Sequence, residues 1–438
     1  MFQYYFKQGV RNLRRNPVLT ALMVLTLAIG VAASISTLTI LHMMSGNPIP
    51  EKSDRLFVPL VDAGPLERYT PGQMPDDDQL NYTDANNFLK SGQGLRRTAV
   101  YGIGGAIEPA QSDLGAINVS GAATTTDFFQ MFNVPFLHGA GWSAADDEHA
   151  INVVVLSRKM SEKLFGKDNP VGQHIRLFSE DFQVTGELDT WEQLPRYTRV
   201  QNGSGGGFAG EDEVYIPFRT AIRKELANNG HVTCSGDTSP GYQGLLNSSC
   251  TWLQFWFEGK SASDRSQLQN YLDAYSREQL KINRMPRQNI NRLFNVMEWL
   301  DHLHVVSNDS RLSTWLAFGF LMLCLVNTIG LLLAKFSARA GEVGVRRALG
   351  ASRAEIFKQF LIEAAVVGLV GGVLGLIMSL GALFMIGRQS DRFAVLAHMD
   401  WSMLALTFAL AILSAVVAGL LPTWRACQVL PAMQLKSQ

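Results

Sequence analysis

The sequence has no excess of charge of either sign. Its 438 residues include 38 lysines and arginines and 38 aspartates and glutamates, so the formal net charge at pH 7 is zero. A protein that binds nucleic acid needs a concentrated basic surface to neutralise phosphates. The balanced composition therefore gives no reason to expect nucleic acid as a partner.

Cysteine is scarce, with four residues in the whole chain. Cys234 and Cys250 lie in one long polar segment, whereas Cys324 lies in an apolar run and Cys427 near the C-terminus. In an oxidising compartment, a bridge between the first two would close a short loop and contribute on the order of 3 kcal/mol. Two free thiols are the alternative, and we favour the disulfide.

The sequence contains no recognisable catalytic, cofactor or metal motif. The Gly-rich stretch 202–210 is followed by Glu211, where a phosphate-binding loop needs lysine. Asp301, His302 and His304 lack an obvious fourth ligand, and side chains two residues apart on a helix point in different directions. We therefore expect this chain not to be an enzyme, and expect no catalytic residue, bound cofactor or metal site on it.

Charged residues are absent from four long stretches, 18–44, 312–334, 364–387 and 401–424. Each is longer than the roughly 20 apolar residues that cross about 30 Å of hydrocarbon as a helix. The first is also too long for the apolar region of a signal peptide, so we expect a retained anchor. The sequence therefore predicts four transmembrane helices, at 18–44, 312–334, 360–387 and 401–424.

Lysine and arginine flank these spans unevenly, which predicts their orientation. The segment 1–17 and the segment 335–359 are rich in them, whereas the short loop 388–400 balances two arginines with two aspartates. Since basic flanks stay in the cytoplasm, both termini and 335–359 are expected there, with 425–438 as a cytoplasmic tail. The segment 45–311 is expected on the outer side.

The outer segment is long enough to form its own core, and its patterns mix both element types. Residues 151–157 are typical of a buried strand, and 174–188 of a hairpin with its turn at 179–181. The predicted fold is an α-helical membrane protein with four transmembrane helices and a large α+β extracytoplasmic domain between the first and second spans. An amphipathic helix at 1–17 is expected on the cytoplasmic lipid surface.

The third span carries small residues spaced for close helix packing. These are Gly368, Gly371, Gly372 and Gly375. They predict a packing face, either within the subunit or across a dimer. At the start of the same span, Glu363 is expected to reach the membrane interface rather than to take part in a proton relay.

Five motifs resemble those of one known family. They are "TTTDFFQMFNVPFLHGAGW" (124–142), "VVVLSRKMSEKLFGKDNPVGQHIRL" (153–177), "DEVYIPFRTA" (212–221), "ARAGEVGVRRALGASRAEIFKQFLIEA" (338–364) and "LPTWRACQVLPAMQLK" (421–436). They are similar to motifs of MacB/FtsX-type permeases, the mechanotransmission or type VII ABC transporters with a MacB-like periplasmic core domain. The match extends over nearly the whole chain.

The resemblance implies that the segment between spans two and three contains a coupling helix that docks on a cytoplasmic ATPase. Its own residues support this, because apolar Val343, Val345, Leu349 and Ile356 alternate with arginines that suit carboxylate partners. Gly350 is expected to form a turn. The predicted ATPase-coupling residues are Arg339, Glu342, Val343, Val345, Arg346, Arg347, Leu349, Gly350 and Arg353.

No nucleotide-binding domain precedes the first span, so a separate ATPase dimer is expected to bind ATP and Mg²⁺ for a pair of permeases. The second permease is either this chain or a paralogue. The resemblance implies a bacterial inner-membrane location and, in the MacB branch, a periplasmic adaptor and a TolC-like outer-membrane channel. The expected function is efflux of peptides, toxins or antibiotics from the periplasm or outer leaflet. FtsX-like signalling to cell-wall hydrolases and Lol-like lipoprotein extraction are the alternatives.

Overall fold

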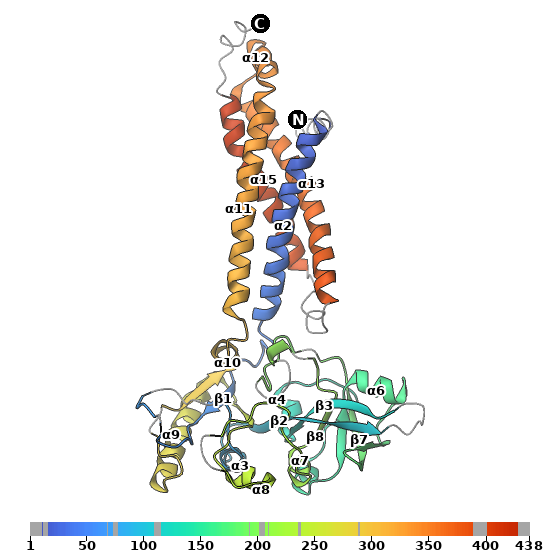
Figure 1. Ribbon diagram of the computed structural model, residues 1–438, viewed down its shortest axis with the longest axis vertical. Helices are drawn as coiled ribbons and strands as arrows, with labels where there is room; N and C mark the ends of the chain where they lie inside the picture. The colour runs from blue at the N-terminus through green and yellow to red at the C-terminus, as the bar shows by residue number, and fades with distance from the viewer. Residues whose placement is uncertain are drawn as a thin grey trace. The chain divides into compact units, whose positions relative to one another are not determined.

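The computed structural model describes residues 11, 16–67, 69–72, 78–108, 115–191, 193–200, 206–208, 210–234, 238–287, 290–388 and 401–427. The predicted amphipathic helix 1–17, the loop 388–400 and the tail 425–438 lie largely outside these residues. The chain forms two compact units, one of residues 1–45 and 306–438 and the other of residues 46–305. Figure 1 shows the long helices of the first unit and the sheet of the second.

The first unit is helical. Among the described residues, its four long helices are apolar and long enough to cross a membrane, as predicted. They are α2 (Pro17–Ser45), α11 (Asn308–Ser337), α13 (Arg353–Gly387) and α15 (Trp401–Cys427). A short helix, α12 (Ala340–Ala348), lies between α11 and α13. The chain is thus an α-helical membrane protein with its large α+β domain between the first two spans.

Helix α13 is packed between α2 and α15 through its glycines. A Cβ atom placed on Gly371 would lie 3.2 Å from the Leu27 Cβ atom of α2, and one on Gly372 would lie 2.6 Å from the Ala411 Cβ atom of α15. Gly375 faces α2 in the same way, and Gly368 faces α15. The small residues therefore serve helix packing within the subunit, which was one of the two possibilities that the sequence left open.

The second unit is built on one mixed sheet with strand order β10-β1-β9-β2-β3-β8-β5-β7-β4, and β6 pairs with β2 and β7. The strands are β1 (Leu56–Leu60), β2 (Arg96–Glu108), β3 (Ile117–Thr124), β4 (Phe136–Gly139), β5 (Val153–Leu156), β6 (His174–Leu177), β7 (Glu180–Leu188), β8 (Val214–Pro217), β9 (Gln254–Glu258) and β10 (Arg292–Asn295). The pairs β3–β8 and β5–β7 are parallel and the others are antiparallel.

Apolar side chains cover both faces of this sheet. Along β9, Phe255 and Phe257 belong to one hydrophobic cluster and Trp256 to another, because successive strand residues point to opposite faces. The surrounding helices are α3 (Tyr82–Lys90), α4 (Asp127–Met131), α5 (Ala144–Glu148), α6 (Arg158–Phe165), α7 (Phe218–Arg223), α8 (Tyr242–Asn247), α9 (Arg265–Lys281) and α10 (Val296–His302), with 3₁₀ turns at Gly206–Phe208 and Ala262–Asp264.

The structure can be compared with two local predictions for this unit, the hairpin at 174–188 and the disulfide between Cys234 and Cys250. Residues 174–188 form the expected hairpin, β6–β7, but its turn lies earlier than predicted, at Phe178 and Ser179, whose φ angles are 53° and 62°. Positive φ at both central residues suits a two-residue turn whose twist matches that of the strands. The structure also contains a disulfide bond between Cys234 and Cys250.

Asp147 is a buried carboxylate that holds two elements of this domain together. It lies in α5, is 8% exposed, and its Oδ1 atom accepts a hydrogen bond from the Arg219 backbone N–H of α7 at 3.1 Å. Burial raises the pKa of Asp147 from 3.8 to about 6, despite this bond. Because the folded state then binds a proton that the unfolded state releases, the contribution of Asp147 to stability falls as pH rises from about 4 through 6.

Replacing Gly372 by leucine tests the helix packing. We expect Gly372→Leu to lower the free energy of unfolding by about 1–3 kcal/mol, because its side chain would overlap α15. Gly381→Leu is the matched control, since a Cβ atom at Gly381 meets nothing within 4 Å. Both variants gain the same helix propensity, so the difference between their melting temperatures in detergent measures the packing alone. Equal melting temperatures would contradict the close approach of α13 and α15.

The protonation of Asp147 can be tested with Asp147→Asn, which is neutral at every pH and keeps an oxygen acceptor for Arg219. We expect the stability of this variant relative to the native protein to increase by about 2 kcal/mol between pH 4.5 and pH 7.5. Thermal or urea unfolding of both proteins at the two pH values measures this difference. A difference that does not change with pH would mean that Asp147 titrates as an exposed carboxylate does.

Candidate functional site

The segment between α11 and α13 folds into a helical hairpin, which we call the α12–α13 hairpin (residues 339–363). Gly350, between the two helices, has a φ of 99°, a conformation that side chains with a Cβ atom rarely adopt. Ser352 then begins α13 with a capping box: its Oγ atom accepts a hydrogen bond from the Glu355 N–H at 3.2 Å, and Glu355 Oε2 accepts one from the Ser352 N–H at 3.3 Å. The chain therefore turns at Gly350, as the sequence analysis predicted.

The inner face of the hairpin is apolar and buried. Val343 of α12 is 5% exposed, and Ile356 and Phe360 of α13 are 4% and 3% exposed. All three belong to one hydrophobic cluster with Phe336 of α11, whose ring centroid lies 4.3 Å from that of Phe360. The sequence analysis was wrong to assign Val343 and Ile356 to a docking surface, because these side chains hold the hairpin together instead.

The outer face of the hairpin presents two apolar side chains to the surroundings. Val345 is 56% exposed and Leu349, one helical turn later, is 83% exposed. Side chains four residues apart lie on the same side of a helix. Val345 and Leu349 are therefore the predicted docking residues that the structure brings together on an accessible surface, which we call the exposed apolar pair.

The charged side chains of α12 mostly contact the hairpin itself. Arg346 Nη2 lies 2.6 Å from Glu342 Oε1, and Arg346 Nη1 donates a hydrogen bond to Gln359 Oε1 of α13 at 3.1 Å. Arg339, just before α12, lies within 3.5 Å of Glu342 and 2.9 Å of Glu363. Three predicted coupling residues, Arg339, Glu342 and Arg346, thus bind within the hairpin, a role that the sequence analysis did not foresee.

The other two predicted arginines lie at either side of the turn. Arg347 is half-buried in the last turn of α12, and Arg353 is exposed at the start of α13. They flank Leu349 in the sequence, so basic and apolar groups occur in the same short segment.

Glu363 is placed differently from the expectation. It is 1% exposed, so its carboxylate is buried within the helical unit instead of pointing outward. Its Oε1 atom lies 2.9 Å from Lys335 Nζ of α11, and its Oε2 atom accepts a hydrogen bond from Arg339 Nη1 at 2.9 Å. Sequence reasoning used Lys335 only as a membrane flank and missed this cluster. The only sign of this cluster in the sequence was Glu363, a single carboxylate at the edge of the apolar run 364–387.

Another buried carboxylate of the domain, Glu258, lies where the segment that follows α2 meets the sheet. Glu258 of β9 is fully buried, with Lys52 and Arg55 each 3.5 Å and Arg96 2.9 Å away. Nearby, the Ser53 carbonyl accepts a hydrogen bond from the Val296 N–H of α10 at 3.3 Å. The chain segments that enter and leave the domain are therefore joined to each other and to the sheet.

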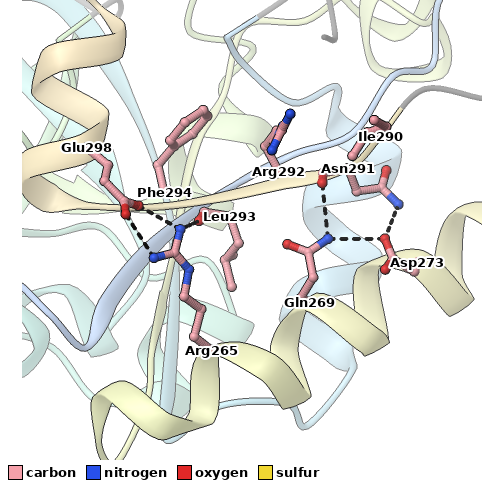
Figure 2. Close-up of a pocket in the computed structure, with 9 residues that line it drawn as sticks. All are labelled: Arg265, Gln269, Asp273, Ile290, Asn291, Arg292, Leu293, Phe294 and Glu298. Carbon is pink, nitrogen blue, oxygen red and sulfur yellow. Dashed lines mark hydrogen bonds and ion pairs between the residues drawn. The ribbon is translucent and has the colours of Figure 1, made fainter. Parts of the chain in front are cut away.

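The domain also has a cavity of about 560 Å³ between α9 and the edge strand β10, lined by polar and apolar side chains (Figure 2). Arg265 forms a two-pronged contact with Glu298 at 2.9 and 2.7 Å and donates to the Leu293 carbonyl. Leu293 pairs with Pro59, which has no N–H to donate. These polar groups satisfy one another, and no group of three potential metal ligands occurs among the residues described.

Comparison with known proteins identifies the family. Residues 20–275 match the family model of the MacB-like periplasmic core domain, and residues 315–431 match that of the FtsX-like permease C-terminal. The first match alone covers more than half of the chain. This chain belongs to the MacB/FtsX-type ABC transporter permeases. It is accordingly a multi-pass membrane protein with a MacB-like periplasmic core domain, as the motifs predicted.

Relatives of this permease family include proteins named for export. The pyoverdine export ATP-binding/permease protein PvdT of Pseudomonas aeruginosa is 26% identical over 72% of this chain and 41% of its own length. The macrolide export ATP-binding/permease protein MacB of Bdellovibrio bacteriovorus is 22% identical over 99% of this chain and 61% of its own. The chain thus spans about half the length of the curated relatives it matches.

A solved structure is also similar. The periplasmic region of MacB from Actinobacillus actinomycetemcomitans matches 59% of this chain and 96% of its own, with 14% identity and a TM-score of 0.37.

Proposed function

We propose that this permease is the membrane subunit of an ABC exporter and that its α12–α13 hairpin docks on an ABC-type ATPase. The exposed apolar pair, Val345 and Leu349, carries the proposal. These side chains are 56% and 83% exposed on a short helix that is otherwise anchored by a buried face. The core of a protein interface is more apolar than its rim, and the basic residues Arg347 and Arg353 occur in the same segment.

ATP binding and hydrolysis would move the hairpin, and α13 would pass the motion to α2 and α15, against which its glycines pack. The permease itself would contribute two alternative arrangements of its helices rather than chemistry. In this proposal the hairpin and both termini face the cytoplasm of a bacterial cell, as the basic flanks favour. The domain of residues 46–305 would then face the periplasm.

The assembly proposed around this chain follows from the same mechanism. An ATPase dimer that binds ATP and Mg²⁺ would serve two permeases, and the second permease would be a copy of this chain or a paralogue. A periplasmic adaptor and a TolC-like outer-membrane channel would complete an efflux system. No solute would need to cross the four spans, because substrate would enter from the periplasm or the outer leaflet.

The substrate class proposed is that of peptides, toxins or antibiotics. Support comes from relatives whose names specify export of pyoverdine and of macrolides. These names favour export over cell-wall signalling or lipoprotein extraction.

Docking can be tested by co-purification from detergent-solubilised membranes of the native host. We expect an ABC-type ATPase to elute with the native permease and to be reduced at least tenfold with Val345→Asp/Leu349→Asp, because buried, unpaired carboxylates oppose association. Mass spectrometry of the eluate and its ATPase activity are the measurements.

A matched control is Val345→Ile/Leu349→Met, which keeps both side chains apolar and should retain the ATPase. The exposed positions make either double variant mild for folding, and melting temperatures within a few degrees of the native protein would verify this. The docking role of the hairpin would be refuted if both double variants retained the ATPase. It would also be refuted if no ATPase eluted with the native permease.

A further inference from the structure

Among the described residues of the helical unit, Glu363 carries the most deeply buried charge. Glu363 is 1% exposed, and its two cationic neighbours, Lys335 and Arg339, are 2% and 12% exposed. Lys335 lies in α11 and Glu363 in α13, and Arg339 is the residue that immediately precedes α12. One carboxylate therefore joins three segments of the chain.

Such a cluster is a poor source of stability. Removing charged groups from water carries a large free-energy cost, and apolar side chains of similar volume often stabilise a buried site as well or better. A buried charge cluster is better suited to fixing one arrangement, because any other arrangement leaves a charge unpaired. Apolar side chains could have filled this site instead of the charged ones, since Phe336 and Phe360 pack directly beside the cluster.

Polar contacts fasten α12 to α13 at both of its ends. Near the turn, Arg346 donates to Gln359 at 3.1 Å. At the other end, Arg339 binds Glu363 at 2.9 Å, and its guanidinium carbon lies 5.7 Å from the centre of the Phe360 ring. A helix held at one end only could pivot about Gly350. With the Glu363 contact in place, α12 cannot swing away from α13 without exposing or unpairing a buried charge.

The next step in the chain of contacts leads into the other spans. Helix α13 meets α2 at Gly371 and Gly375, and the hydroxyl groups of Ser36 and Ser379 lie 3.0 Å apart between the same two helices. A displacement of α12 that moved α13 would thus reach α2. A displacement absorbed by the turn at Gly350 would not reach α2 by this route, although α12 also contacts α15.

We propose that Glu363 is a positioning residue that makes the α12–α13 hairpin move as one body with α13, so that motion imposed on α12 reaches the spans. This proposal rests on the proposed function, since it takes the ATPase to be the source of that motion. Glu363 acts here through Arg339 and Lys335 and binds neither substrate nor nucleotide.

The experiment compares the native permease–ATPase complex with the complex of Glu363→Gln, which keeps the shape of the side chain and removes its charge. Spin labels are placed on cysteines at the exposed positions Ser45 and Leu312, at the ends of α2 and α11. Cys324 and Cys427 are replaced by alanine in all proteins. The measurement is the change in label-to-label distance on addition of ATP and Mg²⁺, with the amount of bound ATPase quantified in each sample.

We expect ATP to change the distance in the native complex. We expect Glu363→Gln to bind a similar amount of ATPase but to lose more than about half of the distance change. Glu363→Asp keeps a negative charge near Lys335 and Arg339 and should retain part of the response, which a role in stability alone does not predict. Lys358→Gln is the matched control, because it removes one exposed charge from the same helix and should respond as the native complex does.

The outcomes separate the two proposals. If no ATPase binds the native permease, the proposed function fails, and the role of Glu363 fails with it. If the ATPase binds and Glu363→Gln shows the full native distance change, the role of Glu363 alone is overturned. Should Glu363→Gln not fold, Arg339→Gln provides the same test, because it releases α12 while leaving the Lys335–Glu363 pair in place.

Discussion

The close approach of α13 to both α2 and α15 is the constraint on which the helical unit depends. In a membrane, apolar side chains gain little by leaving lipid for each other, so helices associate through tight contact and through hydrogen bonds. Four glycines on α13 provide that contact on two sides of one helix, Gly371 and Gly375 toward α2 and Gly368 and Gly372 toward α15. The third span is consequently packed closely against two of the other three spans.

The α12–α13 hairpin extends this arrangement beyond the apolar spans by a different means. There, Val343, Ile356 and Phe360 form a small core, and the ion pairs of Glu363 and Arg346 fix its geometry. What remains on the outside is the exposed apolar pair with its basic neighbours. In the proposed docking, this apolar pair would bind the partner while the buried core and ion pairs of the hairpin limit its movement, as a mechanical coupling requires.

The sequence was sufficient for features that depend on local pattern. Charge-free runs predicted the four long helices, alternation predicted the β6–β7 hairpin, and small-residue spacing predicted the packing face of α13. It was insufficient where the outcome depends on which neighbour a side chain meets. Val343 and Val345 are alike in the sequence, yet Val343 is buried in a cluster with side chains of α11 and α13, whereas Val345 is exposed.

The same reason explains the charged residues. Glu363 and Lys335 flank different apolar runs, and a single sequence gives no sign that the ends of these runs meet. Arg339 and Arg346 were assigned to a partner because an arginine beside a span can bind either a partner protein or the chain itself. Only the fold shows that both bind within the hairpin. Glu258 and its three cations were missed because they are far apart in the chain.

The pairing of β1 with β10 has a consequence for how such proteins diversify. The first and last strands of the domain are neighbours in its sheet, and Ser53 and Val296 are hydrogen-bonded. Both chain ends of the domain therefore leave it at one point, as in domains that tolerate insertion into a host chain. A domain joined in this way can be enlarged, shortened or exchanged between the first two spans while the packing of the helices is kept.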